Sequence, residues 1–403
     1  MTSIALNDLQ AFVVALAALL LGNAIMRRAP WLDRLSVPSP VVGGVLVSVV
    51  VALIRHWGKV EITFASGLTD VLLLVFFTTV GLSAKLSSLK AGGKPLAILC
   101  AVTLLLIIAQ NIVGIGVALG FGADPYYGVL IGSVSFVGGP GTAAAWAKEA
   151  KAAGIEHAPE VAVAGATFAV IVGALVTGPI TGAIVKKKGL KAAQPGRQAP
   201  WMGGKPEERP ESAIPMEEVV RAFLLIMGAV LLGKSLNTWA AGAGVMLPGF
   251  LTAMLAGVAI TNVADLFGRE LNFAPIERDG EFALQAFLVM YLMSLKLWIL
   301  GAAVVPLMVN VVLQVGVSLA IAYYVLFRKL GSDYDAAITV GGFLGFGLSS
   351  MTVGMASMDG VAQRYGPSPK AFLLITLAGS FFVDLANAFV VKGVLLLPIF
   401  GHG

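Results

Sequence analysis

The sequence predicts an all-α polytopic membrane protein. Of its 403 residues, 58% are apolar and only 12% are charged, and the mean hydropathy is +0.91. These values lie far from those of soluble chains. Apolar windows of about 20 residues, enough for a helix to cross ~30 Å of hydrocarbon, recur along the whole length. Glycine supplies 48 residues, which suits helices that pack closely or break within a bilayer. A soluble enzyme core is excluded.

Ten apolar segments are long enough to be membrane spans. They lie near 9–25, 39–54, 68–84, 96–120, 160–185, 218–237, 246–263, 281–300, 302–327 and 371–397. Two further apolar stretches, 126–147 and 334–358, are interrupted by Gly, Pro, Ser and Thr. Broken backbone persists at membrane depth only when protein or a cavity surrounds it, so these stretches are predicted to be re-entrant hairpins.

The basic residues set the predicted orientation, because loops rich in Lys and Arg stay in the cytoplasm. With the N-terminus outside, most of the 27 Lys and Arg fall inside. Those left outside are Arg55, Lys59, Lys148, Lys151, Lys234, Lys296 and Lys392. Both termini are therefore predicted outside. No Lys or Arg precedes the first span, so we interpret it as a retained helix and not a signal peptide.

Segment 186–216 divides the chain almost in half and is polar, with five prolines. Such composition is typical of a linker, here predicted to be cytoplasmic. Its basic residues could bind nucleic acid, but topology determination and attraction to anionic lipid explain them better. The sequence therefore predicts a bilayer partner and no nucleic acid.

The two halves, 1–185 and 217–403, resemble each other in order. Proline opens the second span of each, as PSPVVGG at 38–44 and LPGF at 247–250. Gln110 and Gln314 lie in the middle of the fourth spans, and a broken hairpin follows each. Since five spans per half is an odd number, the halves are predicted to have inverted topology, the plan of secondary transporters.

Residues for enzyme chemistry are scarce at membrane depth. Cys100 is the only cysteine, and His56, His157 and His402 lie near segment ends or at the terminus. This leaves no Cys-based metal site and no intramembrane Ser–His pair. The stretch GAVLLGKS at 228–235 matches a phosphate-loop pattern formally, but it continues a membrane helix instead of a strand–turn–helix unit. We therefore predict that the protein is not an enzyme.

The two hairpins carry the candidate substrate contacts. Turns rich in glycine expose backbone amides, and the positive N-terminal end of a following helix can hold a carboxylate. The candidates in the first hairpin are Ser135, Gly138, Gly139, Gly141 and Thr142. Those in the second are Gly345, Gly347, Ser349, Ser350 and Thr352. An anionic substrate fits this chemistry, although small residues could also serve helix packing alone.

Asp384 is the carboxylate nearest the middle of a long span, where a buried charge needs a partner. Asn387, three residues on, lies on the same helical face. Together with backbone carbonyls they would suit a sodium ion; the alternative is a structural hydrogen bond to a neighbouring helix. Gln110, Asn111 and Gln314 indicate polar contacts inside the bundle.

At these residues the chain resembles the bacterial sodium/glutamate symporter family over its whole length. The pieces that carry the resemblance are VPSPVVGG, QNIVGIG, GGPGTAAAW, SLKLW, RYGPSPKAF and FFVDLANAFVVKGVLLLPIF. The resemblance implies a sodium-coupled glutamate importer of the inner membrane, with ten spans and two re-entrant hairpins. It also implies a homodimer and an elevator motion, in which a domain containing both hairpins slides against a dimerising scaffold.

Departures from the family pattern fall at the hairpin tips. Val137 and Pro140 stand where the family has serine and histidine, and Met351 lies in a second tip that lacks the family's Thr-Pro pair. A cation symporter for a dicarboxylate or hydroxycarboxylate is therefore the main alternative. A passive channel is a different class, and it would require a continuous polar pore.

Overall fold

The computed structural model describes residues 2–29, 38–192, 215–245, 247–269, 271–296 and 303–400. Within this part of the chain, seven helices are long and apolar enough to cross a membrane. They are Asp8–Arg28, Ser39–Gly58, Gly93–Gly120, Ala158–Lys187, Met216–Gly242, Gly249–Leu266 and Val304–Phe327. Each coincides with a predicted span. The predicted span 68–84 falls on the shorter helix Gly67–Leu82, and 371–397 falls on a helix interrupted at 378–382. The predicted span 281–300 overlaps the more charged helix Phe273–Met293, and its residues 297–300 lie outside the described ranges, as does most of the 186–216 linker.

The helices group into two compact units. Unit 1 comprises Met1–Lys85, Ala144–Ala164 and Pro215–Val304. Unit 2 comprises Leu86–Ala143, Gly165–Ile214 and Val305–Gly403. Each unit takes segments from both halves of the sequence. The compact units thus cut across the two predicted repeats instead of coinciding with them.

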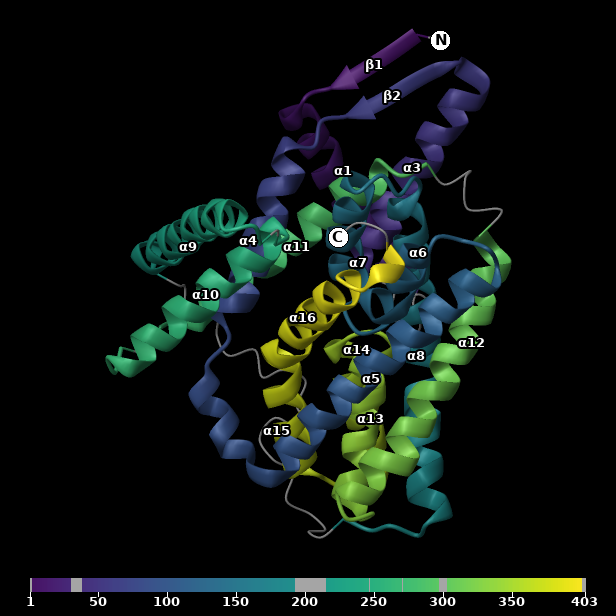
Figure 1. Cartoon of the computed structure of the whole chain (residues 1–403), viewed down its shortest axis with the longest axis vertical. Coiled ribbons are helices and arrows are strands. Elements are labelled where there is room, and N and C mark those ends of the chain that lie inside the picture. The colour runs from purple at the N-terminus through teal and green to yellow at the C-terminus, as the bar shows by residue number, and fades with distance from the viewer. Residues whose placement is uncertain are drawn as a thin grey trace. The chain divides into compact units, whose positions relative to one another are not determined.

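Unit 1 contains the first three long helices of each half (Figure 1). Its elements are β1 (Thr2–Leu6), α1 (Asp8–Arg28), α3 (Ser39–Gly58), β2 (Val60–Phe64), α4 (Gly67–Leu82), α9 (Met216–Gly242), α10 (Gly249–Leu266) and α11 (Phe273–Met293), together with the end of α7 (Gly139–Ala152) and the start of α8 (Ala158–Lys187). Glycines let these helices approach closely: a Cβ on Gly81 would lie 2.0 Å from the Met254 carbonyl oxygen. A Cβ on Gly43 would lie 2.1 Å from that of Ala18. Small residues at helix contacts are the expected packing mode where lipid replaces water.

The all-α prediction missed one feature, a two-stranded parallel ladder formed by β1 and β2 (Figure 1). Its register pairs Thr2 with Val60 and Leu6 with Phe64. Both segments, TSIAL and VEITF, contain β-branched residues that favour strands. The intervening helices α1 and α3 provide the crossover that a parallel pair requires. These two short segments pair because α1 and α3 bring them side by side.

Unit 2 contains the remaining elements. They are η1 (Leu86–Gly92), α5 (Gly93–Gly120), α6 (Pro125–Val129), η2 (Leu130–Val134), the start of α7 (Gly139–Ala152), most of α8 (Ala158–Lys187), α12 (Val304–Ala320), η4 (Ile321–Phe327), α13 (Tyr334–Leu348), α14 (Met351–Tyr365), α15 (Pro369–Leu377), η5 (Ala378–Phe382), α16 (Val383–Leu395) and η6 (Pro398–Phe400). Its core includes Phe136, Phe343 and Phe346, all at most 2% exposed. This core holds the second hairpin and the first hairpin as far as Ala143, where the rest of α7 passes into unit 1.

Equivalent spans of the two halves begin and end alike. Pro38 caps α3 and Pro248 caps α10 in the same extended conformation, with ψ of 138° and 139°. Ser83 ends α4 and Ser294 ends α11, with ψ of −7° and −3°. These local agreements support the correspondence read from the sequence.

Candidate functional site

The first hairpin is a helix that breaks and then turns. It begins at Asp124, whose carboxylate accepts the Tyr126 amide at 2.8 Å, and it departs from helical geometry at Gly132, where ψ is −132°. The chain turns at Val137 and Gly138, and α7 starts at Gly139 with a φ of 66°. A side chain is strained in that region of backbone space. Glycine at 139 is therefore a backbone requirement.

The second hairpin is made by α13 and α14, which pack tightly against each other. A Cβ on Gly345 would lie 2.0 Å from the Cα of Gly354. The turn consists of Ser349 and Ser350. The Ser350 amide donates to the Gly345 carbonyl at 3.0 Å, and its hydroxyl accepts the Val353 amide at 3.4 Å as the N-cap of α14.

The tips of the two hairpins meet in unit 2. A Cβ on Gly139 would lie 3.1 Å from the backbone oxygen of Ser349. Gly173 of α8 packs against the second tip, since a Cβ on Gly173 would lie 2.7 Å from the Ser349 Cβ. The Ser349 hydroxyl is fully buried and has no hydrogen-bond partner among the described residues. The structure thus joins two segments about 200 residues apart in sequence around one unsatisfied hydroxyl.

A buried polar network starts beside the break in the first hairpin. Asn111 of α5 donates through Nδ2 to the Ser133 Oγ at 2.8 Å. The Ser133 Oγ donates in turn to the Asn387 Oδ1 at 2.6 Å, and the Asn387 Nδ2 returns a bond to the Ser133 carbonyl at 3.2 Å. All three side chains are at most 1% exposed. The last span is therefore tied to the first hairpin by uncharged amides and a hydroxyl.

The same network continues to the second hairpin. Gln110 Nε2 donates to the Gly347 carbonyl at 2.7 Å, two residues before Ser349 of that hairpin's tip. Gln314 Nε2 donates to the Gln110 backbone oxygen at 2.9 Å, and Asn310 Nδ2 donates to the Ile131 carbonyl at 2.7 Å. The predicted polar contacts of Gln110, Asn111 and Gln314 inside the bundle are confirmed.

Several buried oxygens in and near this network carry no hydrogen bond within the described part of the chain. They are Gln110 Oε1, Asn111 Oδ1, Gln314 Oε1 and Ser349 Oγ. A buried acceptor without a donor costs about 1–3 kcal/mol. Unpaired oxygens of this kind are the groups that a hard cation or a hydrogen-bonding substrate would satisfy.

The other predicted site residues occupy varied surroundings in unit 2. Asp384 is half-buried in the first turn of α16, and no bond to it occurs among the described residues. Ser135 is fully buried and donates to the Leu130 carbonyl at 2.6 Å. Thr352 is exposed at the start of α14. A Cβ on Gly347 would lie 2.6 Å from the Leu106 side chain, which gives this glycine a packing role as well.

Sequence reasoning missed Ser133, Asn310 and Gly173. Asn310 precedes Gln314 by one helical turn in the same apolar span, and that polar i, i+4 pair was a usable signal. Ser133 and Gly173 are small residues among many, and only the fold distinguishes them. No cluster of three or more His, Cys, Asp or Glu able to hold a metal ion occurs in the described ranges.

A multi-pass helical chain with two helical hairpins and a buried uncharged network is typical of a membrane transporter. The sequence model of the family described as "Sodium/glutamate symporter" matches residues 4–367. The sodium/glutamate symporter of Escherichia coli (strain K12) is 36% identical over 98% of this chain and 99% of its own length. The Haemophilus influenzae sodium/glutamate symporter is 34% identical over 95% of this chain and 96% of its own.

This chain belongs to the sodium/glutamate symporter family, as the motifs predicted. Among solved structures, the sodium proton antiporter MjNhaP1 from Methanocaldococcus jannaschii aligns over 98% of both chains. Its sequence identity is 14% and its TM-score is 0.43, a similarity too low to support a conclusion.

Proposed function

We propose that this protein is a sodium-coupled symporter that imports glutamate across the inner membrane. The observation that carries the proposal is the match to the family over residues 4–367, together with 36% identity to the Escherichia coli sodium/glutamate symporter over 98% of this chain. Sodium moving down its gradient would supply the free energy for uptake. In this role sodium is a transported ion and not a resident cofactor.

The substrate site in this proposal lies at the meeting point of the two hairpin tips. The predicted contacts are Ser135, Gly138, Gly139, Gly141, Thr142, Gly345, Gly347, Ser349, Ser350 and Thr352. Among them, Ser349 has the strongest support, because its buried hydroxyl lacks a partner and its backbone oxygen lies close to Gly139 of the first tip. Backbone amides at the starts of α7 and α14 would bind carboxylate oxygens.

The sodium ligands in this proposal remain Asp384 and Asn387. Asn387 belongs to the buried network beside the first hairpin, and Asp384 lies about one turn away on the same helix. The unpaired amide oxygen of Asn111 is near, because Asn111 bonds the same serine as Asn387. Oxygen ligands from one carboxylate and several amides suit a hard monovalent cation.

The architecture proposed for transport is two inverted repeats of five spans, each with a re-entrant hairpin. It is supported by the matching helix ends of the two halves and by the way each compact unit draws from both. Unit 2, which contains both hairpin tips and the whole second hairpin, would be the moving part of an elevator mechanism, and unit 1 the scaffold of a homodimer. Alternating access around repeat-related elements is the common scheme of such folds.

A dicarboxylate or hydroxycarboxylate symporter is the second candidate. It is favoured by Val137 and Pro140 at the first tip, where the family pattern has serine and histidine. Both candidates share the anion chemistry of the tips and differ in whether an amino group is recognised. Competition between glutamate and succinate for uptake separates them.

Reconstitution into proteoliposomes tests the proposal. We expect labelled glutamate to accumulate with an inward sodium gradient and to stay at background in sodium-free buffer, whatever the pH gradient. Accumulation driven by a pH gradient alone would rule out sodium coupling, and flux that never saturates would favour a channel.

The proposed orientation has its own test. With both termini outside, a cysteine at Ser212 in a Cys100→Ala background should resist an impermeant thiol reagent in intact cells and react after permeabilisation. Labelling in intact cells would show that the orientation is the opposite of the one proposed, and it would leave the proposed transport function unaffected.

A further inference from the structure

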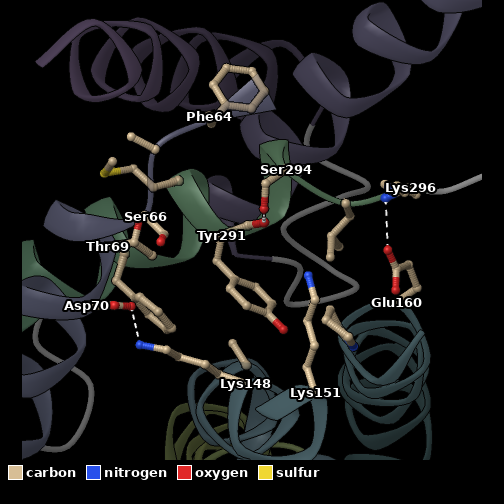
Figure 2. A pocket seen from close by; sticks show the side chains of 16 residues that line it. Phe64, Ser66, Thr69, Asp70, Lys148, Lys151, Glu160, Tyr291, Ser294 and Lys296 are labelled. Atoms are coloured by element: carbon tan, nitrogen blue, oxygen red, sulfur yellow. Dashed lines mark hydrogen bonds and ion pairs between the residues drawn. The ribbon is translucent and has the colours of Figure 1, made fainter. Parts of the chain in front are cut away.

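Unit 1 contains a pocket of about 290 Å³ that the transport proposal leaves unused (Figure 2). It is enclosed by the end of β2 with the start of α4, the C-terminal half of α7, the start of α8 and the end of α11. The volume is close to the lower end of the range for small-molecule sites, about 300 Å³. In the proposed topology, these helix ends all lie on the outer side of the membrane.

The pocket has an excess of positive charge. Lys148 pairs with Asp70, and the Glu160 carboxylate accepts the backbone amide of Lys296 at 3.1 Å. The lining as a whole has three lysines, Lys148, Lys151 and Lys296, against two carboxylates, Asp70 and Glu160. The ammonium groups of Lys151 and Lys296 have no ion-pair partner in the part of the chain that the structure describes.

A buried hydroxyl donor stands beside these lysines. Tyr291 extends from α11 into the space between Lys148 and Lys151 (Figure 2). Its hydroxyl is buried and has no hydrogen-bond partner among the described residues. An unpaired phenol next to an unpaired ammonium is a matched pair of donors for a carboxylate.

The lysine that corresponds to Lys296 in the first half of the chain has an ion-pair partner. Lys85 matches Lys296 in the alignment of GLSAKL with LMSLKL, yet Lys85 forms an ion pair with Asp265 at 2.8 Å. At that position an internal carboxylate neutralises the lysine. The excess charge in the outer pocket is therefore not a general property of this repeat.

We propose that this pocket is a second anion site. In it, Lys151 and Tyr291 bind a small carboxylate in an outer vestibule before the carboxylate is transported. That the carboxylate is the transported acidic amino acid rests on the proposed function; the anion preference follows from the charges and the phenol. A fixed positive field at an entrance raises the local concentration of an anionic substrate.

Charge-selective thiol labelling tests the site directly. Ser294 is exposed and lines the pocket, so Ser294→Cys in a Cys100→Ala background should react faster with an anionic than with a cationic methanethiosulfonate. Lys151→Gln should lower that ratio of rates by roughly fivefold, the scale of losing one nearby unit charge. Ala241→Cys, exposed on α9, is the control, and its ratio should not respond to Lys151→Gln.

Protection identifies the ligand. Sodium glutamate should slow labelling of Ser294→Cys more than sodium chloride of equal ionic strength, and Tyr291→Phe should reduce this protection while leaving the ratio of rates unchanged. Two results would contradict the proposed anion site: equal protection by chloride, or a ratio of anionic to cationic labelling rates that Lys151→Gln does not change.

Uptake kinetics separate the vestibule from the transport function. Lys151→Gln should raise the KM for glutamate severalfold at constant maximal rate, whereas Lys234→Gln, an exposed lysine of α9, should change neither. Sodium-driven uptake without protection at Ser294→Cys would remove the vestibule alone. Protection without sodium-driven uptake would remove the proposed function alone.

Discussion

The two hairpin tips of unit 2 reach the same place by different backbone routes. The first enters its return helix at Gly139, with a φ of 66° that disfavours every side chain. The second turns through Ser349 and Ser350, whose φ angles of −160° and −163° are extended backbone open to any residue. The first tip is thus constrained by conformation and the second by its hydroxyls. Substitutions at the two tips should fail for different reasons.

The largest effect is expected at the first tip. Gly139→Val should reduce uptake to background, because a side chain there is strained and its Cβ would press on the Ser349 carbonyl at 3.1 Å. Gly182→Val is the matched control, since a Cβ on that helical glycine meets nothing within 4 Å. Uptake is measured at equal amounts of folded protein, judged by size-exclusion chromatography. Wild-type uptake in Gly139→Val would mean that the tip tolerates a different turn.

A residue on neither tip tests whether both serve one ion-coupled site. Asp384→Asn should abolish sodium-driven accumulation and leave a folded protein, because the amide keeps the shape but loses the charge that a desolvated cation needs. The measurement is the sodium dependence of initial rates. Unchanged sodium dependence would reassign Asp384 to a structural role.

The network below the first tip should respond in stability. Ser133→Ala removes the hydroxyl that joins Asn111 to Asn387, leaving buried groups unpaired at a cost of about 1–3 kcal/mol. Thermal unfolding in detergent measures the loss. Ser3→Ala, on an exposed strand of unit 1, is the control and should leave the unfolding temperature unchanged. If Ser133→Ala unfolds at the same temperature as the parent, the network does not contribute to stability.

The two serines of the second tip should separate. Ser349→Ala should weaken substrate binding by about 0.5–1.5 kcal/mol, the net worth of one hydrogen bond, with little change in unfolding. Ser350→Ala should cost stability instead, about 0.5–2 kcal/mol, because it removes the N-cap of α14. Glutamate KM and unfolding temperature are measured on both variants. If the KM for glutamate changed only in Ser350→Ala, Ser350 and not Ser349 would be the serine that binds the substrate.

The smallest expected effect on rate is a change of preference at the first tip. Restoring the family residues with Val137→Ser and Pro140→His should favour glutamate over succinate in competition uptake, if these positions choose the substrate. Identical inhibition profiles in the parent and the double variant would mean that the first tip does not determine substrate specificity, which would then be sought near Asp384 and Asn387.

Local signals in the sequence located the helix turns at 137–138 and 349–350 and most of the spans. Hydropathy found the segments that became α1, α3, α5 and α8, because burial in lipid imposes an apolar composition that needs no knowledge of neighbours. Glycine and proline clusters marked the hairpin turns, since a break in a membrane helix requires residues that tolerate it. The phosphate-loop pattern at 228–235 was correctly dismissed, as it lies within the continuous helix α9.

The sequence by itself determined the membrane class, the family and the position of the two tips, because these depend on composition and on motifs contiguous in the chain. Only the tertiary structure decided that Gly139 meets Ser349, that Ser133 joins Asn111 to Asn387, and that the compact units cross the repeat. It also separated a capping Ser350 from an unpaired Ser349. The physical reason is that hydrogen-bond satisfaction and close approach are pairwise properties of residues distant in sequence, and no local pattern records which partner the fold will supply.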